Sequence, residues 1–156
     1  MKNKEHYYKS NYIRYLLGKY DKNIEKAIID YLNNCNDIND FNAIIKICGI
    51  FDEALCCWRI YEEIISRIDY NDKLLDEIDC NLFNGVFSGE DGLANSYYEK
   101  HCFFKKIKSK DDKVIKFAKR EADNYKILYQ GEKNRQEKNK IIKESKYKLE
   151  QSNIVS

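Results

Sequence analysis

The sequence contains no proline, only six glycines and a single tryptophan in 156 residues. Proline inside a helix removes a backbone hydrogen bond and clashes with the preceding turn, so its absence favours long uninterrupted helices. The sequence also lacks any apolar run that approaches the roughly 20 residues of a membrane-spanning helix. A chain of this length can bury a core without metals or disulfides, and we expect one soluble domain.

A charge excess of one sign is also missing, because 35% of the residues are charged while the formal net charge is only +2. Interspersed signs predict solvated faces, give little support for nucleic-acid binding and exclude an acidic decoy. The first residues, MKNKEHYYKSN, carry charge without the apolar run of a secretion signal. We therefore expect a cytoplasmic protein with reduced thiols. Its cysteines are Cys35, Cys48, Cys56, Cys57, Cys80 and Cys102.

Apolar residues recur at three- and four-residue spacings, which predicts an all-α fold of six to seven antiparallel helices. The expected helices cover residues 4–20, 24–32, 40–48, 52–68, 74–82, 90–107 and 112–128. Asp21 or Asn23 is expected to cap the second helix and Asp40 the third. The short polar joints fit either a HEAT-like α-solenoid fragment or an irregular helical bundle.

Residues 51–68, FDEALCCWRIYEEIISRI, form the only segment whose apolar side chains cover more than one helical face. Such a helix needs neighbours on several sides, so it is expected to be the centre of packing around Trp58.

The composition changes near Gly131, where the apolar pattern thins. From residue 131 to 150 there are seven Lys and Arg against four Glu, and the apolar residues are Ile141, Ile142, Tyr147 and Leu149. We predict one helical domain over residues 1–131, followed by a charged helical extension over 132–156 whose last residues are disordered.

Residues 84–134 contain a glycine-serine loop, FSGEDG, a tyrosine-bearing helix, NSYYEKHCFFKKI, and then DDKVIKFAKREADNY. This pattern resembles the terminal HEAT-like helical repeat of large bacterial proteins, many of them associated with defence. In such repeats the second helix opens with an acidic residue, followed by Val and a small residue on one face, as Asp111, Val114 and Ala118 would be. Lys116 and Arg120 fall where basic residues are usual.

The resemblance implies a curved helical stack that binds proteins or, less often, nucleic acid, with no catalytic residues. Its relatives carry this segment behind long solenoids or nucleotide-hydrolysing domains, whereas few helices precede it here. The resemblance therefore suggests a small bacterial or phage protein of the immunity, inhibitor or anti-defence type, which binds a partner protein, needs no cofactor and is not an enzyme.

Catalytic and metal chemistry have weaker support in the residue pattern. His101 and Cys102 are adjacent, and neighbours on a helix point about 100° apart, so they cannot easily share a reacting atom. No C-x₂-C pair is present to bind zinc. The glycine loop at 85–92 lacks the G-K-[ST] of a phosphate-binding loop, and its Glu90 and Asp91 would repel an anion.

Two binding hypotheses remain. Thirteen tyrosines favour a protein interface, because tyrosine gives a large amphipathic contact at low entropic cost. The expected contact residues are Phe87, Glu90, Asp91, Tyr97 and Tyr98. The alternative is a nucleic-acid-binding surface on the last two helices, with acidic residues interspersed. Its residues are Lys105, Lys106, Lys108, Lys116, Lys119 and Arg120.

Overall fold

The computed structural model describes residues 18–35, 37–51, 54–69, 72–83, 89 and 91–154. Over these residues the fold is all-α, with six α-helices, one 3₁₀ helix and no strand, which confirms the predicted fold class. Most of the helix expected over residues 4–20 lies outside the described residues, because these begin at residue 18. Residues 155–156, part of the expected disordered end, also lie outside them. None of the described helices combines the length and apolar content that a membrane span requires.

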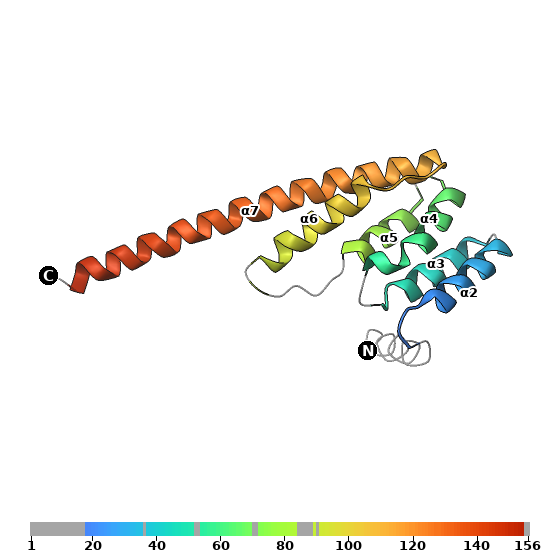
Figure 1. Ribbon diagram of the computed structural model, residues 1–156, viewed down its shortest axis with the longest axis horizontal. Helices are drawn as coiled ribbons and strands as arrows, with labels where there is room; N and C mark the ends of the chain where they lie inside the picture. The colour runs from blue at the N-terminus through green and yellow to red at the C-terminus, as the bar shows by residue number, and fades with distance from the viewer. Residues whose placement is uncertain are drawn as a thin grey trace. The chain divides into compact units, whose positions relative to one another are not determined.

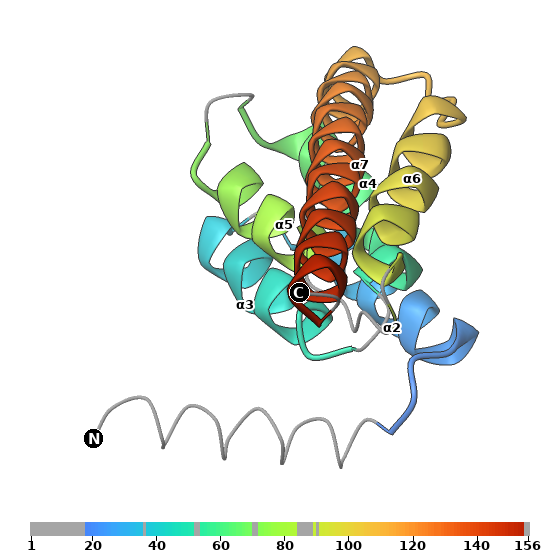
Figure 2. The same cartoon turned by 90° about the vertical axis from the view of Figure 1, so that its left-hand side faces the viewer.

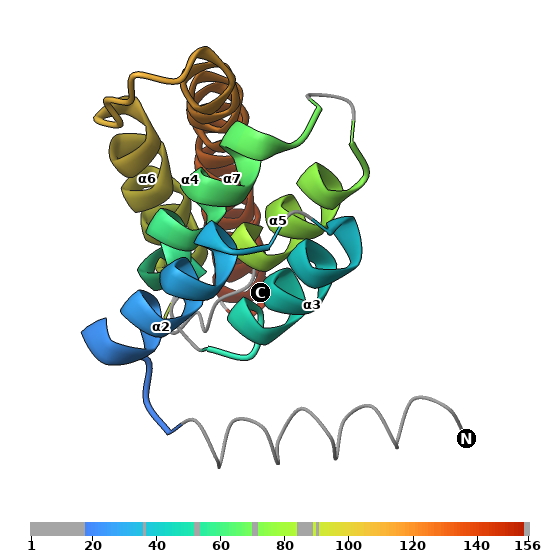
Figure 3. The ribbon, with the colours of Figure 1, turned by 90° about the vertical axis from the view of Figure 1, so that its right-hand side faces the viewer.

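Contacts divide the chain into two compact units, Met1–Val86 and Phe87–Ser156. The first contains α2 (Lys22–Asn33), α3 (Ile38–Cys48), the 3₁₀ helix η1 (Ala54–Cys57), α4 (Trp58–Arg67) and α5 (Leu74–Phe83). Here α2 packs on α4 and α3 packs on α5 (Figures 1 and 3). The predicted division at residue 131, between a packed domain and a charged extension, stays a prediction.

Aspartate side chains set where the first helices begin. Asp21 Oδ1 accepts hydrogen bonds from the amides of Asn23 and Ile24, so it caps α2 as predicted. The cap predicted for α3 was wrong, because Asp37 accepts from the Asn39 amide at 2.8 Å and starts the helix one turn earlier. Asp40 lies in the first turn and accepts a hydrogen bond from the Cys35 thiol.

The predicted packing helix begins later than residue 52. α4 starts at Trp58, because the preceding residues form the tighter 3₁₀ turn η1, which buries Cys57 completely. Its broad apolar face is confirmed, since five of its ten residues are buried. These are Trp58, Ile60, Tyr61, Ile64 and Ile65.

Gly49, at the end of α3, lies against an amide that joins three elements. Asn81 on α5 donates from Nδ2 to the Ile45 carbonyl at 2.7 Å and to the Tyr61 hydroxyl at 3.2 Å. A Cβ at position 49 would clash with Asn81 Oδ1. Gly49→Ala should therefore lower the free energy of unfolding by about 1–3 kcal/mol in urea titrations, because the amide must give up these bonds.

Gly131 provides the matched control, because no atom lies within 4 Å of a Cβ added there and the residue is inside a helix. Gly131→Ala should raise stability by about 0.5–1 kcal/mol through helix propensity. If both substitutions stabilised the protein, the close approach of Asn81 to Gly49 would be refuted.

The second unit is a helical hairpin of α6 (Gly92–Lys105) and α7 (Asp112–Ile154). Asp111 caps α7 by accepting from the amides of Lys113 and Val114. α7 has 43 residues and continues through Gly131, so the seventh helix and the charged extension are one helix. At 1.5 Å per residue α7 is about 65 Å long, whereas the 14-residue α6 spans about 21 Å (Figure 1). Figure 2 looks along α7 and shows α6 beside it.

Candidate protein-binding surface

Two polar contacts fix how α6 lies along α7. His101 Nδ1 on α6 donates a hydrogen bond to the Ala122 carbonyl at 2.8 Å, which leaves the imidazole in a packing role. Lys133 Nζ on α7 donates to Asp91 Oδ1, just before α6, at 2.9 Å. Because Asp91 precedes α6, no residue of α6 lies opposite the part of α7 that follows Lys133.

The α7 face that meets α6 is apolar only as far as Tyr125, over about the first third of the helix. Its buried apolar residues are Val114, Phe117, Ala118, Ala122 and Tyr125. Further along the same face the residues are Glu132, Gln136, Asn139 and Lys143. Glu132 is buried, and hydrogen bonds from Arg135 lower its pKa. The change in polarity explains why the packed part of the hairpin ends near this residue.

Lys100 is a charged side chain inside the hairpin. It is 6% exposed, and its Nζ lies 5.4 Å from the centre of the Tyr125 ring. Burial lowers the pKa of Lys100 from 10.5 to about 8, because the apolar surroundings penalise the ammonium form. The burial of Lys100 could not be predicted from its residue type or charge, since lysine is almost always exposed.

Lys100→Met should raise the free energy of unfolding at pH 7 by about 1–3 kcal/mol, because methionine has a side chain of similar length but carries no charge to bury. Between pH 8 and 10.5 the unfolded chain binds more protons than the folded chain, so wild-type stability rises with pH in this window. The advantage of the variant should therefore shrink between urea titrations at pH 7 and at about pH 9.5. A variant less stable than wild type at pH 7 would contradict the assignment.

Three of the predicted contact residues precede or open the hairpin. Phe87 and Glu90 lie outside the described residues. Asp91 is exposed and forms the ion pair with Lys133, so its carboxylate holds the start of α6 against α7.

The two predicted tyrosines lie on different sides of α6. Tyr97 is 6% exposed, and its ring lies 6.2 Å from that of Tyr125 in the hairpin core. Tyr98 is 52% exposed, and its ring lies 5.4 Å from that of Tyr129. Tyr98 is therefore available at the surface, whereas Tyr97 packs inside.

The basic residues of the nucleic-acid hypothesis lie near the turn between α6 and α7. Five are exposed lysines: Lys105, Lys106, Lys108, Lys116 and Lys119. The sixth, Arg120, donates to Glu121 at 2.9 Å and lies over the ring of Phe117. Residues 87–156 carry 17 Lys and Arg against 11 Asp and Glu, a net charge of +6, whereas residues 1–86 carry 11 against 15, or −4.

The cysteines are all free thiols. Cys57 is fully buried beside Cys48, and a hydrogen bond with Cys48 together with burial raises the pKa of the Cys57 thiol. The Cys56 and Cys57 sulfur atoms are 3.7 Å apart. Within the described ranges no group of three or more His, Cys, Asp or Glu is placed to hold a metal ion.

The surface that sequence reasoning did not single out is the part of α7 beyond α6, residues 133–154, which we call the distal segment. Every residue from 137 to 149 is exposed. Ile141, Ile142, Tyr147 and Leu149 are 53–63% exposed. The available signal was the seven-residue spacing that joins Leu128, Ile142 and Leu149.

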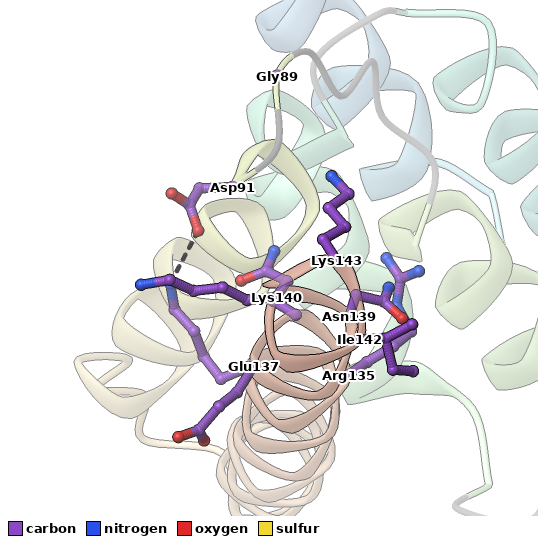
Figure 4. Close-up of a pocket in the computed structure, with 10 residues that line it drawn as sticks. Gly89, Asp91, Arg135, Glu137, Asn139, Lys140, Ile142 and Lys143 are labelled. Atoms are coloured by element: carbon purple, nitrogen blue, oxygen red, sulfur yellow. Dashed lines mark hydrogen bonds and ion pairs between the residues drawn. The ribbon is translucent and has the colours of Figure 1, made fainter. Parts of the chain in front are cut away.

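A cleft of about 940 Å³ lies along the distal segment. Its lining includes Gly89, Asp91, Arg135, Lys140 and Lys143. Figure 4 shows Arg135 and Ile142 on one side of α7 and Glu137 on another.

No protein-family model, curated protein or solved structure was found to match this chain. The HEAT-like resemblance of residues 84–134 therefore stays a prediction. In the structure Asp111 caps α7, and Val114 and Ala118 are buried.

Proposed function

We propose that this chain is a small non-enzymatic cytoplasmic protein that binds a partner protein and occludes its surface, as inhibitors, immunity proteins and anti-defence proteins do. The binding surface is the distal segment of α7. The observation that carries the proposal is that four large apolar side chains, 53–63% exposed, lie on the part of α7 that α6 does not cover.

Exposed apolar side chains on a helix are costly to leave in water and favourable to bury. Covering the side chains of Ile142 and Leu149 would contribute roughly 1.5–3 kcal/mol each if burial were complete. An amphipathic helix that places such residues at helical spacing is a common way to bind a protein groove or another helix. Tyr147 adds an amphipathic ring to the same segment.

The proposal is tested by affinity capture with the full chain from a nuclease-treated extract of the cell in which it functions. We expect one protein to be retained in a fixed ratio to the chain at physiological salt. Retention of nucleic acid from an untreated extract, with no protein retained after nuclease treatment, would overturn the proposal.

Nucleic-acid binding is the second candidate, favoured by the net charge of +6 on residues 87–156 and by the five exposed lysines near the α6–α7 turn. It predicts affinity that falls steeply as salt rises, because lysine contacts to phosphate release counterions. Fluorescence anisotropy with labelled DNA and RNA at about 50 and 200 mM salt measures this. Binding that is absent at low salt would exclude it.

A further inference from the structure

We infer that the partner presents an acidic amphipathic helix, which packs along one side of the distal segment. This inference rests on the proposed function and names the chemical class of its partner. It is carried by the arrangement of apolar and charged residues around α7.

Three apolar side chains of α7 lie at positions that are separated by seven or fourteen residues. Leu128, Ile142 and Leu149 are 37%, 53% and 63% exposed. Positions seven apart on a helix point only about 20° away from each other. The three residues, with Arg135 at the intervening position, therefore form one narrow row, which we call the heptad seam. A second helix packed along this side of α7 would cover the row, and Lys138 and Ser145 would lie beside it at the other core position of the heptad.

The charges around the heptad seam are arranged unevenly. Lys138 and Lys146 flank Ile142 within about 40° on either side of the helix. Glu137 and Glu144 point about 140–160° away from Ile142, on the opposite side. Both lysines and both glutamates are exposed, so the apolar row has a basic border and the acidic residues lie behind it.

The lysines that flank the heptad seam decide which charge the partner helix should carry. Positions flanking the seam of paired helices form ion pairs that decide which partner is accepted. The cations at this border are Arg135, Lys138 and Lys146, which lie within about 40° of Ile142, whereas Lys133, Lys140 and Lys148 point about 120–180° away. Glutamates or aspartates beside the apolar row of a partner helix would meet these cations, and basic residues there would be repelled.

The same border argues against a second copy of this chain. Two distal segments packed through their heptad seams would bring Lys138 and Lys146 of one copy against lysines of the other in either orientation. Like charges across such a contact are destabilising, so self-association is not expected.

The direct test uses a labelled synthetic helical peptide with leucines at heptad spacing and glutamates flanking them. We expect the full chain to bind it at micromolar concentrations in fluorescence anisotropy, with affinity that weakens as salt rises. The double variant Ile142→Asp/Leu149→Asp should lose at least about tenfold in affinity, because it removes the apolar row and adds negative charge. The same peptide with lysines in place of glutamates should not bind.

Ile141→Asp is the matched control, since Ile141 is 56% exposed but lies about 100° around the helix from Ile142. It should change affinity less than about threefold. No binding of the acidic peptide at about 1 mM, or equal losses for Ile141→Asp and Ile142→Asp/Leu149→Asp, would overturn the inference. Concentration-dependent dimerisation of the chain through Ile142, seen in sedimentation, would also overturn it.

The inference can fail while the proposed function stands. In that case the chain captures a protein from the cell extract, the variant Ile142→Asp/Leu149→Asp captures the same protein, and the acidic peptide does not displace it. If no protein is captured at all, the proposed function itself is wrong.

Discussion

Trp58→Ala should lower the free energy of unfolding by about 3–5 kcal/mol. Trp58 is the first residue of α4 and is only 7% exposed, in the helix whose other buried residues are Ile60, Tyr61, Ile64 and Ile65. Truncation removes the largest side chain of this face and leaves a cavity that its neighbours cannot fully close. Urea titration followed by far-UV circular dichroism measures the change, because the substitution deletes the only tryptophan.

Arg59→Ala is the control at the next position. The Arg59 side chain is 72% exposed and its ion pair with Glu25 lies at the surface, so the expected loss is below about 1 kcal/mol. If Trp58→Ala cost no more than Arg59→Ala, α4 would not be the centre of packing in residues 1–86.

Phe104→Ala should destabilise the α6–α7 hairpin by about 3–5 kcal/mol. Phe104 is 2% exposed, its ring is parallel to that of Tyr125 at 5.9 Å, and it meets Phe103 edge-on at 5.2 Å. The substitution therefore loses burial together with two aromatic contacts. Far-UV circular dichroism reports the helices of both units, while Trp58 fluorescence reports residues 1–86, so a loss of helix signal before the fluorescence changes reports the hairpin.

Tyr98→Ala serves as the comparison for the hairpin. Tyr98 is 52% exposed and contacts Tyr129 at the surface, so its loss should cost less than about 1 kcal/mol. A loss for Phe104→Ala as small as this would mean that the ring stack does not hold α6 on α7.

Local signals predicted most of the helices. The spacing of apolar residues located α2, α5 and α7, and Asp21 caps α2 because an aspartate before a periodic run can accept from the first free amides. The same rule could not choose between Asp37 and Asp40, which both lie in a segment rich in Asn and Asp. The start of α4 at Trp58 was not predicted, because the apolar spacing does not distinguish the 3₁₀ turn η1 from a first turn of α-helix.

The candidate site was predicted less well than the fold. Tyr97 and Tyr98 are neighbours with the same side chain, and only the packing of α6 on α7 decides that one is buried and the other exposed. Nothing in the residue type indicated that Lys100 is buried, because lysine is almost always exposed. The distal segment was predicted to be charged and helical. Its exposure as a binding surface depends on how far along α7 the first residues of α6 reach, which the spacing of residues in α7 alone does not give.

Hydrogen–deuterium exchange along α7, with and without the captured partner protein, tests the central claim that the distal segment is the binding surface. We expect amides of residues 137–149 to gain protection on binding, because a helix covered on one side opens less often. The amides near the α6–α7 turn should change little. Unchanged exchange over 137–149, with protection gained around Lys105 and Lys108 instead, would contradict the claim.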